Sequence, residues 1–480
     1  MIRARRTLTF AALLALPLAA CTTAAASQAP VASASAPVAV QAEPKAKNVI
    51  LFIGDGMGIS TITAARIYAG QKHGQTGEEY VLPFERFQNV ALVKTYNTNA
   101  QVPDSAGTAS AMQTGVKTRI GMLGVGPETP HSDCLAALAH RLPTLGEQAK
   151  ERGLALGIVS TARITHATPA AVYAHVPNRD WEADAAMPAE ARAQGCTDIA
   201  SQLVSKDFDL ALGGGRGAFF GKEKRGMRLD AGADLPAGWV ARSGGTYVET
   251  AAQLAAAPEG KPVLGLFSPS HMTYTVDRAA DSTEPTLTEM TATAISLLDG
   301  DPQGYYLMVE SGRIDHGHPA GQAGYALEEA VEFTSAIQYA IEHTDPAETL
   351  ILVTADHSHV FTMSGYPRRG NDILGYVHSP AGGEGAGSDY DGPALAEDGK
   401  PYTTLGYGNG PGSIAGMADR PMPETGVKAH QQATIPLGSE THGGEDVALY
   451  GQGPGAERVR GVIEQNLIYD IMVKALGWKE

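Results

Sequence analysis

The segment VESGRIDHGHP, residues 309–319, places two carboxylates and two histidines within nine positions, directly after an apolar run. Acids and imidazoles at this density are rare in a packed core, because burying a charge is costly unless the charge is paired or bound to a metal. The segment therefore indicates a site that holds a ligand. Its polar members, closed by Pro319, are Glu310, Asp315, His316 and His318.

Further candidate ligands follow other apolar runs. Asp55 ends the run that begins at residue 47, and Asp356 and His357 end the run that begins at residue 349. Oxygen ligands alone favour magnesium or calcium, whereas carboxylates mixed with imidazoles favour zinc. Each residue alone could be an ordinary turn residue, but together they predict at least two ions of different type. The set is completed by His166, Thr168 and His442.

A candidate nucleophile lies in PDSAGTASAMQTG, residues 103–115. Small helix-forming residues follow Ser105, so its hydroxyl is expected at a helix N-terminus, which attracts anions. A serine hydroxyl needs a base or a metal to become nucleophilic. No Gly-x-Ser-x-Gly elbow is present, which favours activation by a cation. The alternatives are a helix N-cap for Ser105 and a surface arginine for Arg179, the candidate bidentate clamp for phosphate oxygens.

The elements that must position these residues predict an α/β protein. Runs such as 47–56, 154–168, 304–311 and 349–359 are apolar enough for strands buried on both faces of a parallel sheet. Helix-period stretches at 286–300 and 323–343 alternate with them. We expect a three-layer αβα sandwich with a mostly parallel central sheet, a last strand in 444–454 and a closing helix in 461–476. The site is expected beyond the carboxyl ends of the strands.

Composition limits the partners. The chain has 480 residues, 43% of them hydrophobic, and a formal net charge of -16. This charge argues against binding nucleic acid, which needs a basic face. A small anionic substrate requires bound cations to reverse the field locally.

The first 44 residues read as export and tethering segments. Three arginines and a short apolar run predict a signal peptide over residues 1–20. The order Leu-Ala-Ala-Cys ending at Cys21 predicts a lipidated cysteine, although an ordinary signal peptide with a chance cysteine is the alternative. Residues 21–44, rich in Ala, Ser and Pro, are expected to be a flexible tether to a domain over 45–480. We expect a lipid-anchored protein on the periplasmic side of the outer membrane or at the cell surface.

Two cysteines remain after Cys21. In an exported protein Cys134 and Cys196 are expected to pair, with two buried thiols as the alternative. Residues 364–438 are Gly-rich and irregular, which is typical of a functional loop or an inserted subdomain.

Over residues 45–478 the chain resembles the alkaline phosphatases. His166 and the Gly-rich insertion, which is similar to the animal crown region, favour the animal and marine-bacterial type, and Cys134 and Cys196 match an animal disulfide. The segments occur in family order: AKNVILFIGDGMG, DSAGTASA, ATPAAVYAHVPNRDW, VESGRIDHGH, VTADHSH, GYPRRG, YGNGPG and ETHGGEDVALYGQGP.

The resemblance implies hydrolysis of phosphate monoesters through a phosphoserine at Ser105. Arg179 would clamp the phosphate, oriented by Asp104, with His316 near the phosphate. Two zinc ions about 4 Å apart would stabilise the entering and leaving oxygens. The family also implies a homodimer.

The resemblance further implies a zinc ion held by Asp55, Asp356 and His357 beside Ser105. Asp55 would also contact one magnesium ion, whose site Thr168 and Glu310 would complete, and His166 would contact a water bound to that ion.

The second zinc ion is where the chain departs from the family. Asp315 and His442 match two ligands, but Pro319 stands where the family has a third, a histidine, and proline cannot bind a metal. We expect His318 to replace it; the alternatives are an exposed loop imidazole for His318 and a helix start for Pro319. Ser268 stands where the animal enzymes have an acidic calcium ligand, so no calcium site is expected.

Two rival functions remain at this point. A sulfatase of the same superfamily needs an arginine that DSAGTAS lacks, and a diesterase tends to use threonine and to lack an equivalent of Arg179. A lipid-anchored protein that binds phosphate or metal without turnover is the rival outside enzymes, made conceivable by Pro319.

Overall fold

The protein is described by a computed structural model that covers residues 45–380 and 392–479. The predicted signal peptide, the lipidation at Cys21 and the tether over 21–44 lie outside the described residues. Within 45–380 and 392–479, no helix combines the length and the hydropathy that crossing a bilayer requires.

A ten-stranded sheet forms the centre of the fold, in the order β15-β2-β14-β8-β1-β7-β3-β4-β6-β5. Every paired strand is parallel to its neighbour except β14, which is antiparallel to both β2 and β8. The apolar runs of the sequence are the central strands, whose residues are buried throughout. The prediction of a mostly parallel sheet is therefore confirmed. The strands are β1 (Asn48–Gly54), β2 (Asn89–Lys94), β3 (Ala155–Arg163), β4 (Leu210–Gly214), β5 (Thr246–Val248), β6 (Val263–Leu266), β7 (Tyr305–Ser311), β8 (Thr349–Ala355), β14 (Val447–Gln452) and β15 (Gly461–Glu464).

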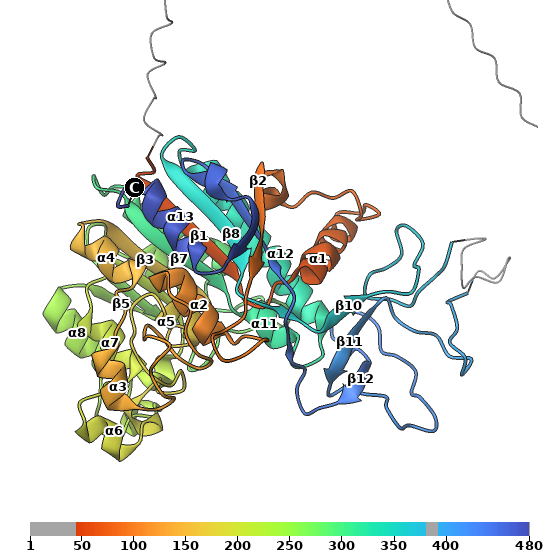
Figure 1. The fold of residues 1–480 in the computed structure, drawn as a ribbon, viewed down its shortest axis with the longest axis horizontal. Helices are drawn as coiled ribbons and strands as arrows, with labels where there is room; N and C mark the ends of the chain where they lie inside the picture. The colour runs from red at the N-terminus through yellow and green to blue at the C-terminus, as the bar shows by residue number, and fades with distance from the viewer. Residues whose placement is uncertain (1–44, 381–391, 480) are drawn as a thin grey trace, which may run out of the picture. The chain divides into compact units, whose positions relative to one another are not determined.

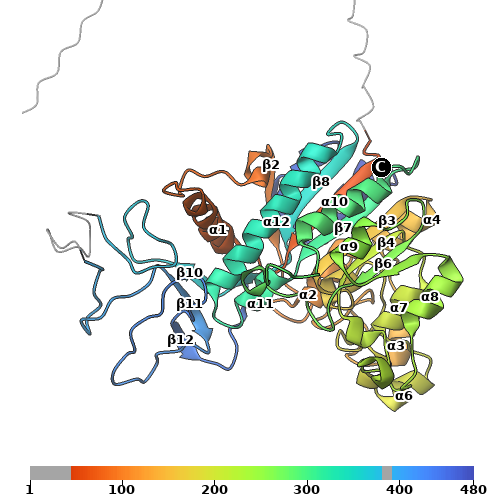
Figure 2. The ribbon, with the colours of Figure 1, turned by 180° about the vertical axis from the view of Figure 1, so that it is seen from behind.

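Helices cover both faces of this sheet, as the two opposite views show (Figure 1, Figure 2). One face carries α1 (Ile59–Lys72), α10 (Leu287–Leu298) and α12 (Ala323–His343), and both α1 and α10 pack on α12. The other carries α2 (Ser105–Thr114), α4 (Leu145–Glu151), α5 (Ala167–Ala170) and α13 (Leu467–Ala475). The three-layer αβα arrangement is thus confirmed.

The remaining helices are short and lie mainly in the segments that connect the strands. α11 directly follows β7 and precedes α12, so it carries the second half of the opening motif. The short helices are α3 (Cys134–Ala139), α6 (Ala189–Ala193), α7 (Ile199–Ser205), α8 (Leu235–Ser243), α9 (Ala251–Ala255) and α11 (Arg313–Gly317).

Two small sheets complete the fold. The strands β10 (Phe361–Met363), β11 (Leu405–Gly410) and β12 (Ala433–Pro436) form one, beside α11 in both views (Figure 1, Figure 2). The strands β9 (Ser358–His359) and β13 (His442–Gly443) form the other, an antiparallel pair. The described part of the predicted insertion over 364–438 therefore contains β11 and β12, joined by long irregular segments.

The prediction for the C-terminal helix was partly wrong, whereas the predicted disulfide was confirmed. The closing helix expected over 461–476 begins only at Leu467, because the first residues of that stretch pair with β2 as β15. The apolar spacing of the segment did not reveal this edge strand. The predicted disulfide is present: Cys134 and Cys196 are bonded, with their Cα atoms 5.9 Å apart.

Candidate active site

Three adjacent strands deliver the carboxylates of the site. Asp55 and Asp356 directly follow β1 and β8, which run parallel with Gly54 opposite Ala355. Glu310 lies near the end of β7, opposite Ile53 of β1. Parallel strands end at the same edge of a sheet, so these side chains converge there, as the sequence predicted.

Ser105 occupies the first position of α2 and faces this edge. Its Oγ lies 3.3 Å from Oδ1 of Asp55 and 3.1 Å from Nε2 of His357. Ser105 is buried, and the helix N-terminus beside it favours an incoming negative charge. A carboxylate and an imidazole are groups that can activate a serine hydroxyl, whereas the N-cap of α2 is the preceding residue, Asp104.

Asp104 is the residue that caps α2. Its Oδ1 accepts a 3.0 Å hydrogen bond from the backbone N–H of Gly107, and its Oδ2 accepts one of 2.9 Å from Nη1 of Arg179. Burial opposes ionisation of Asp104, but Arg179 and the backbone donors hold its pKa below the usual value. The guanidinium of Arg179 is thereby fixed at the N-cap of α2, and its Nη2 also contacts Nε2 of His166 at 3.1 Å.

Asp55, Asp356 and His357 form the first of three potential metal-binding groups within residues 45–380 and 392–479, with one ligand atom of each within 4.8 Å of the others. All three are fully buried. Burial, followed by the neighbouring Asp356 and Asp315, raises the pKa of Asp55 well above its ordinary value. A divalent cation is the natural partner of carboxylates held this close, since it removes their mutual repulsion.

Asp55, His166 and Glu310 form the second group by the same criterion. Four buried polar atoms of this region make no hydrogen bond within the described residues: Asp55 Oδ2, His166 Nδ1, Thr168 Oγ1 and Glu310 Oε1. These are the residues that the sequence assigned to magnesium. Three of these four atoms are oxygens, which suits that ion. Burial and then Asp356 raise the pKa of Glu310 to about 7.

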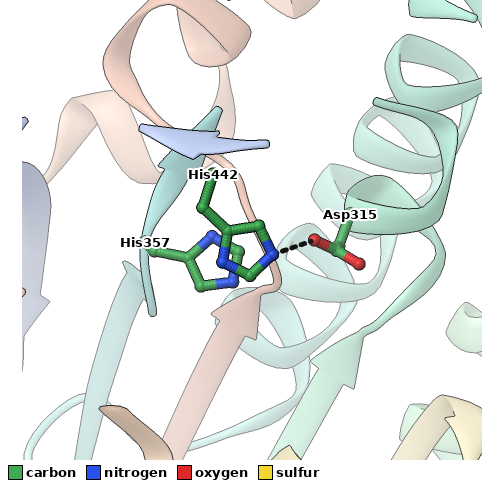
Figure 3. Close-up of side chains that lie close together, drawn as sticks. All are labelled: Asp315, His357 and His442. Atoms are coloured by element: carbon green, nitrogen blue, oxygen red, sulfur yellow. Dashed lines mark ion pairs between the residues drawn. The ribbon is translucent and has the colours of Figure 1, made fainter. Parts of the chain in front are cut away.

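Asp315, His357 and His442 form the third group (Figure 3). Nε2 of His442 lies 3.5 Å from Oδ1 of Asp315, and Nδ1 of His442 is held by the carbonyl of Pro103 at 2.8 Å. The rings of His357 and His442 stack with centroids 3.6 Å apart and an interplanar angle of 18°. His357 thus lies between two groups, whereas Asp315 and His442 belong to this one.

His318, which the sequence analysis expected as the replacement ligand, lies outside the three groups. Its Nε2 contacts Oγ1 of Thr61 at 3.1 Å and its Nδ1 contacts the hydroxyl of Tyr407 at 2.9 Å. Both ring nitrogens are therefore engaged, and burial lowers the pKa of His318, which keeps the ring neutral. The structure describes His318 as a buried imidazole with two hydrogen-bond partners, outside the three groups.

His316 lies at the rim of the site. Its ring is 5.6 Å from that of His166 and 4.1 Å from that of His271, measured between centroids. Burial lowers its pKa to about 4, so the ring is neutral at physiological pH. Its place beside His166, which contacts Arg179, fits the expected role near the phosphate.

Sequence reasoning missed two residues next to the third group. Nε2 of His359 lies 3.0 Å from Oδ1 of Asp315, and its Nδ1 lies 2.7 Å from Oε2 of Glu440. Burial opposes protonation, but these two carboxylates raise the pKa of His359 to about 9. The signal was present in the spacing: His359 follows His357 by two residues, and Glu440 precedes His442 by two.

A buried set of carboxylates and imidazoles around a serine at a helix N-terminus, at the carboxyl edge of a parallel α/β sheet, is the site of a metal-dependent hydrolase. The alkaline phosphatase family model matches residues 46–478. The chain belongs to the alkaline phosphatase family, whose members are phosphoric monoester hydrolases, and the resemblance found in the sequence is confirmed.

Relatives support this assignment. The chain is 46% identical over 458 residues to the tissue-nonspecific alkaline phosphatase of Gallus gallus, a match that covers 90% of this chain and 84% of that protein. It is 44% identical over 454 residues to the Homo sapiens enzyme of the same name, covering 90% and 83%. The expected similarity to animal enzymes is therefore confirmed.

Solved structures show the same fold. The alkaline phosphatase of Thermus thermophilus superposes with a TM-score of 0.66 at 24% identity, covering 92% of this chain and 95% of that one. The enzyme of the Antarctic bacterium TAB5 gives 0.62 at 23% identity, covering 92% and 100%.

Proposed function

We propose that this phosphomonoesterase works through a phosphoserine at Ser105, assisted by two zinc ions and one magnesium ion. The observation that carries the proposal is the position of the Ser105 hydroxyl, 3.1 Å from His357 and 3.3 Å from Asp55 at the start of α2. A hydroxyl placed between groups that can hold a cation, at the positive end of a helix, is suited to attack a phosphate.

The residues fit the three ions by their chemistry. Asp55, Asp356 and His357 offer the mixed carboxylate and imidazole set that zinc prefers. The unpartnered oxygens of Asp55, Thr168 and Glu310 suit magnesium. The second zinc ion would be held by Asp315 and His442.

The ions would lower the pKa of the Ser105 hydroxyl and stabilise the negative charge on the entering and leaving oxygens. In the first step Oγ of Ser105 loses its proton to solvent and forms a bond to phosphorus as the bond from phosphorus to the alcohol oxygen breaks, and the alcohol oxygen takes up a proton from water. In the second step a water oxygen loses a proton and attacks phosphorus, the Ser105–phosphorus bond breaks, Oγ of Ser105 regains a proton, and inorganic phosphate leaves. Each step inverts phosphorus, so the overall reaction retains its configuration.

Arg179 positions the phosphoryl group in this scheme. Its guanidinium can donate to two phosphate oxygens at once, and Asp104 holds it in place for that contact. A chain with a net charge of -16 can bind a dianion here because Arg179 and the ions supply local positive charge.

The test is turnover of p-nitrophenyl phosphate by purified protein with zinc and magnesium, followed by acid quench and mass spectrometry of the Ser105 peptide. We expect turnover and a phosphorylated Ser105, and we expect Ser105→Ala to lose both. Ser110→Ala is the matched control, because Ser110 lies on the same helix but bonds the backbone of Met122 and Gly124. It should keep the phosphoenzyme.

Two results would contradict the proposal. A Ser105→Ala protein that still accumulates phosphoenzyme would remove Ser105 as the nucleophile. Tight phosphate binding without turnover by the wild type would favour the rival in which the chain captures phosphate or metal without hydrolysis.

We also propose that the protein is exported, anchored through lipid on Cys21 to the outer membrane or the cell surface, and homodimeric. The lipobox-like order before Cys21 and the family's usual dimer support this. Labelling with radioactive palmitate, compared between wild type and Cys21→Ser, tests the anchor. Light scattering of the lipid-free domain tests the dimer, and a monomer mass would contradict it.

A further inference from the structure

The third potential metal-binding group, Asp315, His357 and His442, has only two ligands that it does not share with the first group. A catalytic zinc ion takes three protein ligands and keeps one open position. Asp315 and His442 supply two. The inference below rests on the proposed two-zinc function and concerns the third ligand.

His357 is a poor choice for that ligand. Two imidazoles on one tetrahedral zinc have ring centroids about 5 Å apart, since each nitrogen is ~2 Å from the ion and the ligands spread by ~109°. The rings of His357 and His442 are stacked only 3.6 Å apart (Figure 3). His357 also lies 3.4 Å from both Asp55 and Asp356, so it belongs with them.

His318 is excluded by its partners. Thr61 and Tyr407 engage its two ring nitrogens, and releasing either one would leave a buried polar group unsatisfied.

His359 has the required position. It lies directly opposite His442 in the antiparallel β9/β13 pair, so the two side chains emerge side by side on one face. Their ring centroids are 5.3 Å apart with an interplanar angle of 80°, close to the spread expected for two imidazoles on one ion.

The second ring nitrogen of His359, Nε2, lies beside the carboxylate of Asp315. Nε2 of His359 and Oδ1 of Asp315 are 3.0 Å apart, yet neither atom makes a hydrogen bond within the described residues. Two buried polar atoms this close, without a hydrogen bond between them, can both bind one metal ion. His359 belongs to none of the three groups, so a bound zinc ion must bring its Nε2 and that of His442 closer together.

The other side of the ring is fixed. Nδ1 of His359 donates to Oε2 of Glu440 at 2.7 Å, an arrangement that orients a histidine and strengthens it as a metal ligand. Gly56 makes room for the imidazole, because a Cβ at this position would overlap Nε2 of His359. Its φ of 68° is also one that glycine adopts without strain.

We propose that His359 is the third protein ligand of the second zinc ion, held by Glu440, in the place that Pro319 leaves without a ligand. Pro319 contributes a backbone contact instead: its carbonyl accepts a 3.0 Å hydrogen bond from the N–H of Glu440. One ligand of the second zinc ion would thus come from the strand after β8, instead of from the segment after β7 that supplies it in the family.

The first experiment measures zinc per chain in purified holoprotein by mass spectrometry, in titrations against a chelator. We expect two zinc ions in the wild type. His359→Gln should weaken the second by more than about 100-fold, beyond the 10–100-fold typical of a residue that only supports a ligand. His318→Gln is the matched control, a buried imidazole with its ring 4.5 Å away, and it should keep two. Adding Pro319→His to His359→Gln should restore the second ion.

The second experiment is a crystal structure of the zinc-loaded wild type with anomalous scattering, which does not depend on a variant folding. We expect Nε2 of His359 about 2.0–2.1 Å from the ion. A second zinc ion bound without His359, a wild type that holds only one zinc ion, or zinc loss in His318→Gln but not in His359→Gln would overturn the inference. Phosphorylation of Ser105 in that same wild type would show that the proposed function stands even so.

Discussion

Oδ2 of Asp104 accepts a 2.9 Å hydrogen bond from Nη1 of Arg179, while Oδ1 of the same carboxylate caps the helix that begins with Ser105. One side chain therefore positions both the proposed nucleophile and the proposed phosphate clamp. A change that separates these two tasks tests the relationship.

Asp104→Asn makes that separation. Asparagine caps a helix about as well as aspartate, so α2 should remain intact. The charge-assisted bond to Arg179 is lost, which removes about 1.5–3 kcal/mol and weakens inhibition by inorganic phosphate by about 10-fold or more. The inhibition constant of inorganic phosphate, compared between wild type and variant, measures the change. Asp133→Asn, at the exposed N-cap of α3, is the control and should leave phosphate affinity unchanged. Equal affinity in both variants would mean that Arg179 needs no anchor.

Glu310→Gln tests the proposed magnesium site. The variant removes a charge from the group formed with Asp55 and His166, so we expect magnesium to bind at least about 10-fold more weakly. The melting temperature, followed against magnesium concentration at fixed zinc, reports this through the linkage of binding to stability. Glu147→Gln is the control, because Glu147 bonds His175 and Lys206 instead. An unshifted magnesium curve in Glu310→Gln would place the ion elsewhere.

Glu329 predicts a pH dependence of stability. Burial raises its pKa from 4.5 to about 7, although the N–H of Thr275 donates to it at 2.6 Å. The folded state therefore holds a proton on Glu329 that the unfolded state releases, so the contribution of Glu329 to the free energy of unfolding falls as pH rises from 4.5 to 7 and is constant above. Glu329→Gln keeps the acceptor and removes the charge.

Glu329→Gln should raise the free energy of unfolding relative to the wild type, and this gain should grow between pH 4.5 and 7 to about 3 kcal/mol. Urea unfolding at several pH values measures it. Glu332→Gln is the control on the same helix, where a less buried carboxylate accepts from the N–H of Thr288. A gain in the free energy of unfolding that does not change with pH would show that Glu329 does not have a raised pKa in the folded protein.

The disulfide predicts a loss of stability on removal. It links residues 62 positions apart, and closing a loop of this length is worth about 4 kcal/mol through the entropy of the unfolded chain. The double variant Cys134→Ser/Cys196→Ser should melt several degrees lower. Turnover per folded molecule should be unchanged, since neither cysteine belongs to the three metal-binding groups. An unchanged melting temperature would show that the bond does not constrain folding.

The sequence alone predicted the chemistry at the ends of the strands, because each polar residue follows an apolar run in a fixed order. Asp55, Glu310 and Asp356 could be placed together once the runs were taken as parallel strands, since parallel strands end at one edge. The strand β15 could not be predicted, because its residues are half exposed and carry a weak pattern.

Sequence proximity alone did not indicate which histidines lie beside Asp315. His318 lies one residue before Pro319, but one residue along a helix turns a side chain by about 100°, toward Thr61 and Tyr407. His359 and His442 are 83 residues apart in number and become neighbours only when β9 pairs with β13. The sequence determined which kinds of ligand exist and where the strands present them. The tertiary structure decided which imidazole faces Asp315, because that depends on the pairing of two short strands and on the helical turn that carries His318 away.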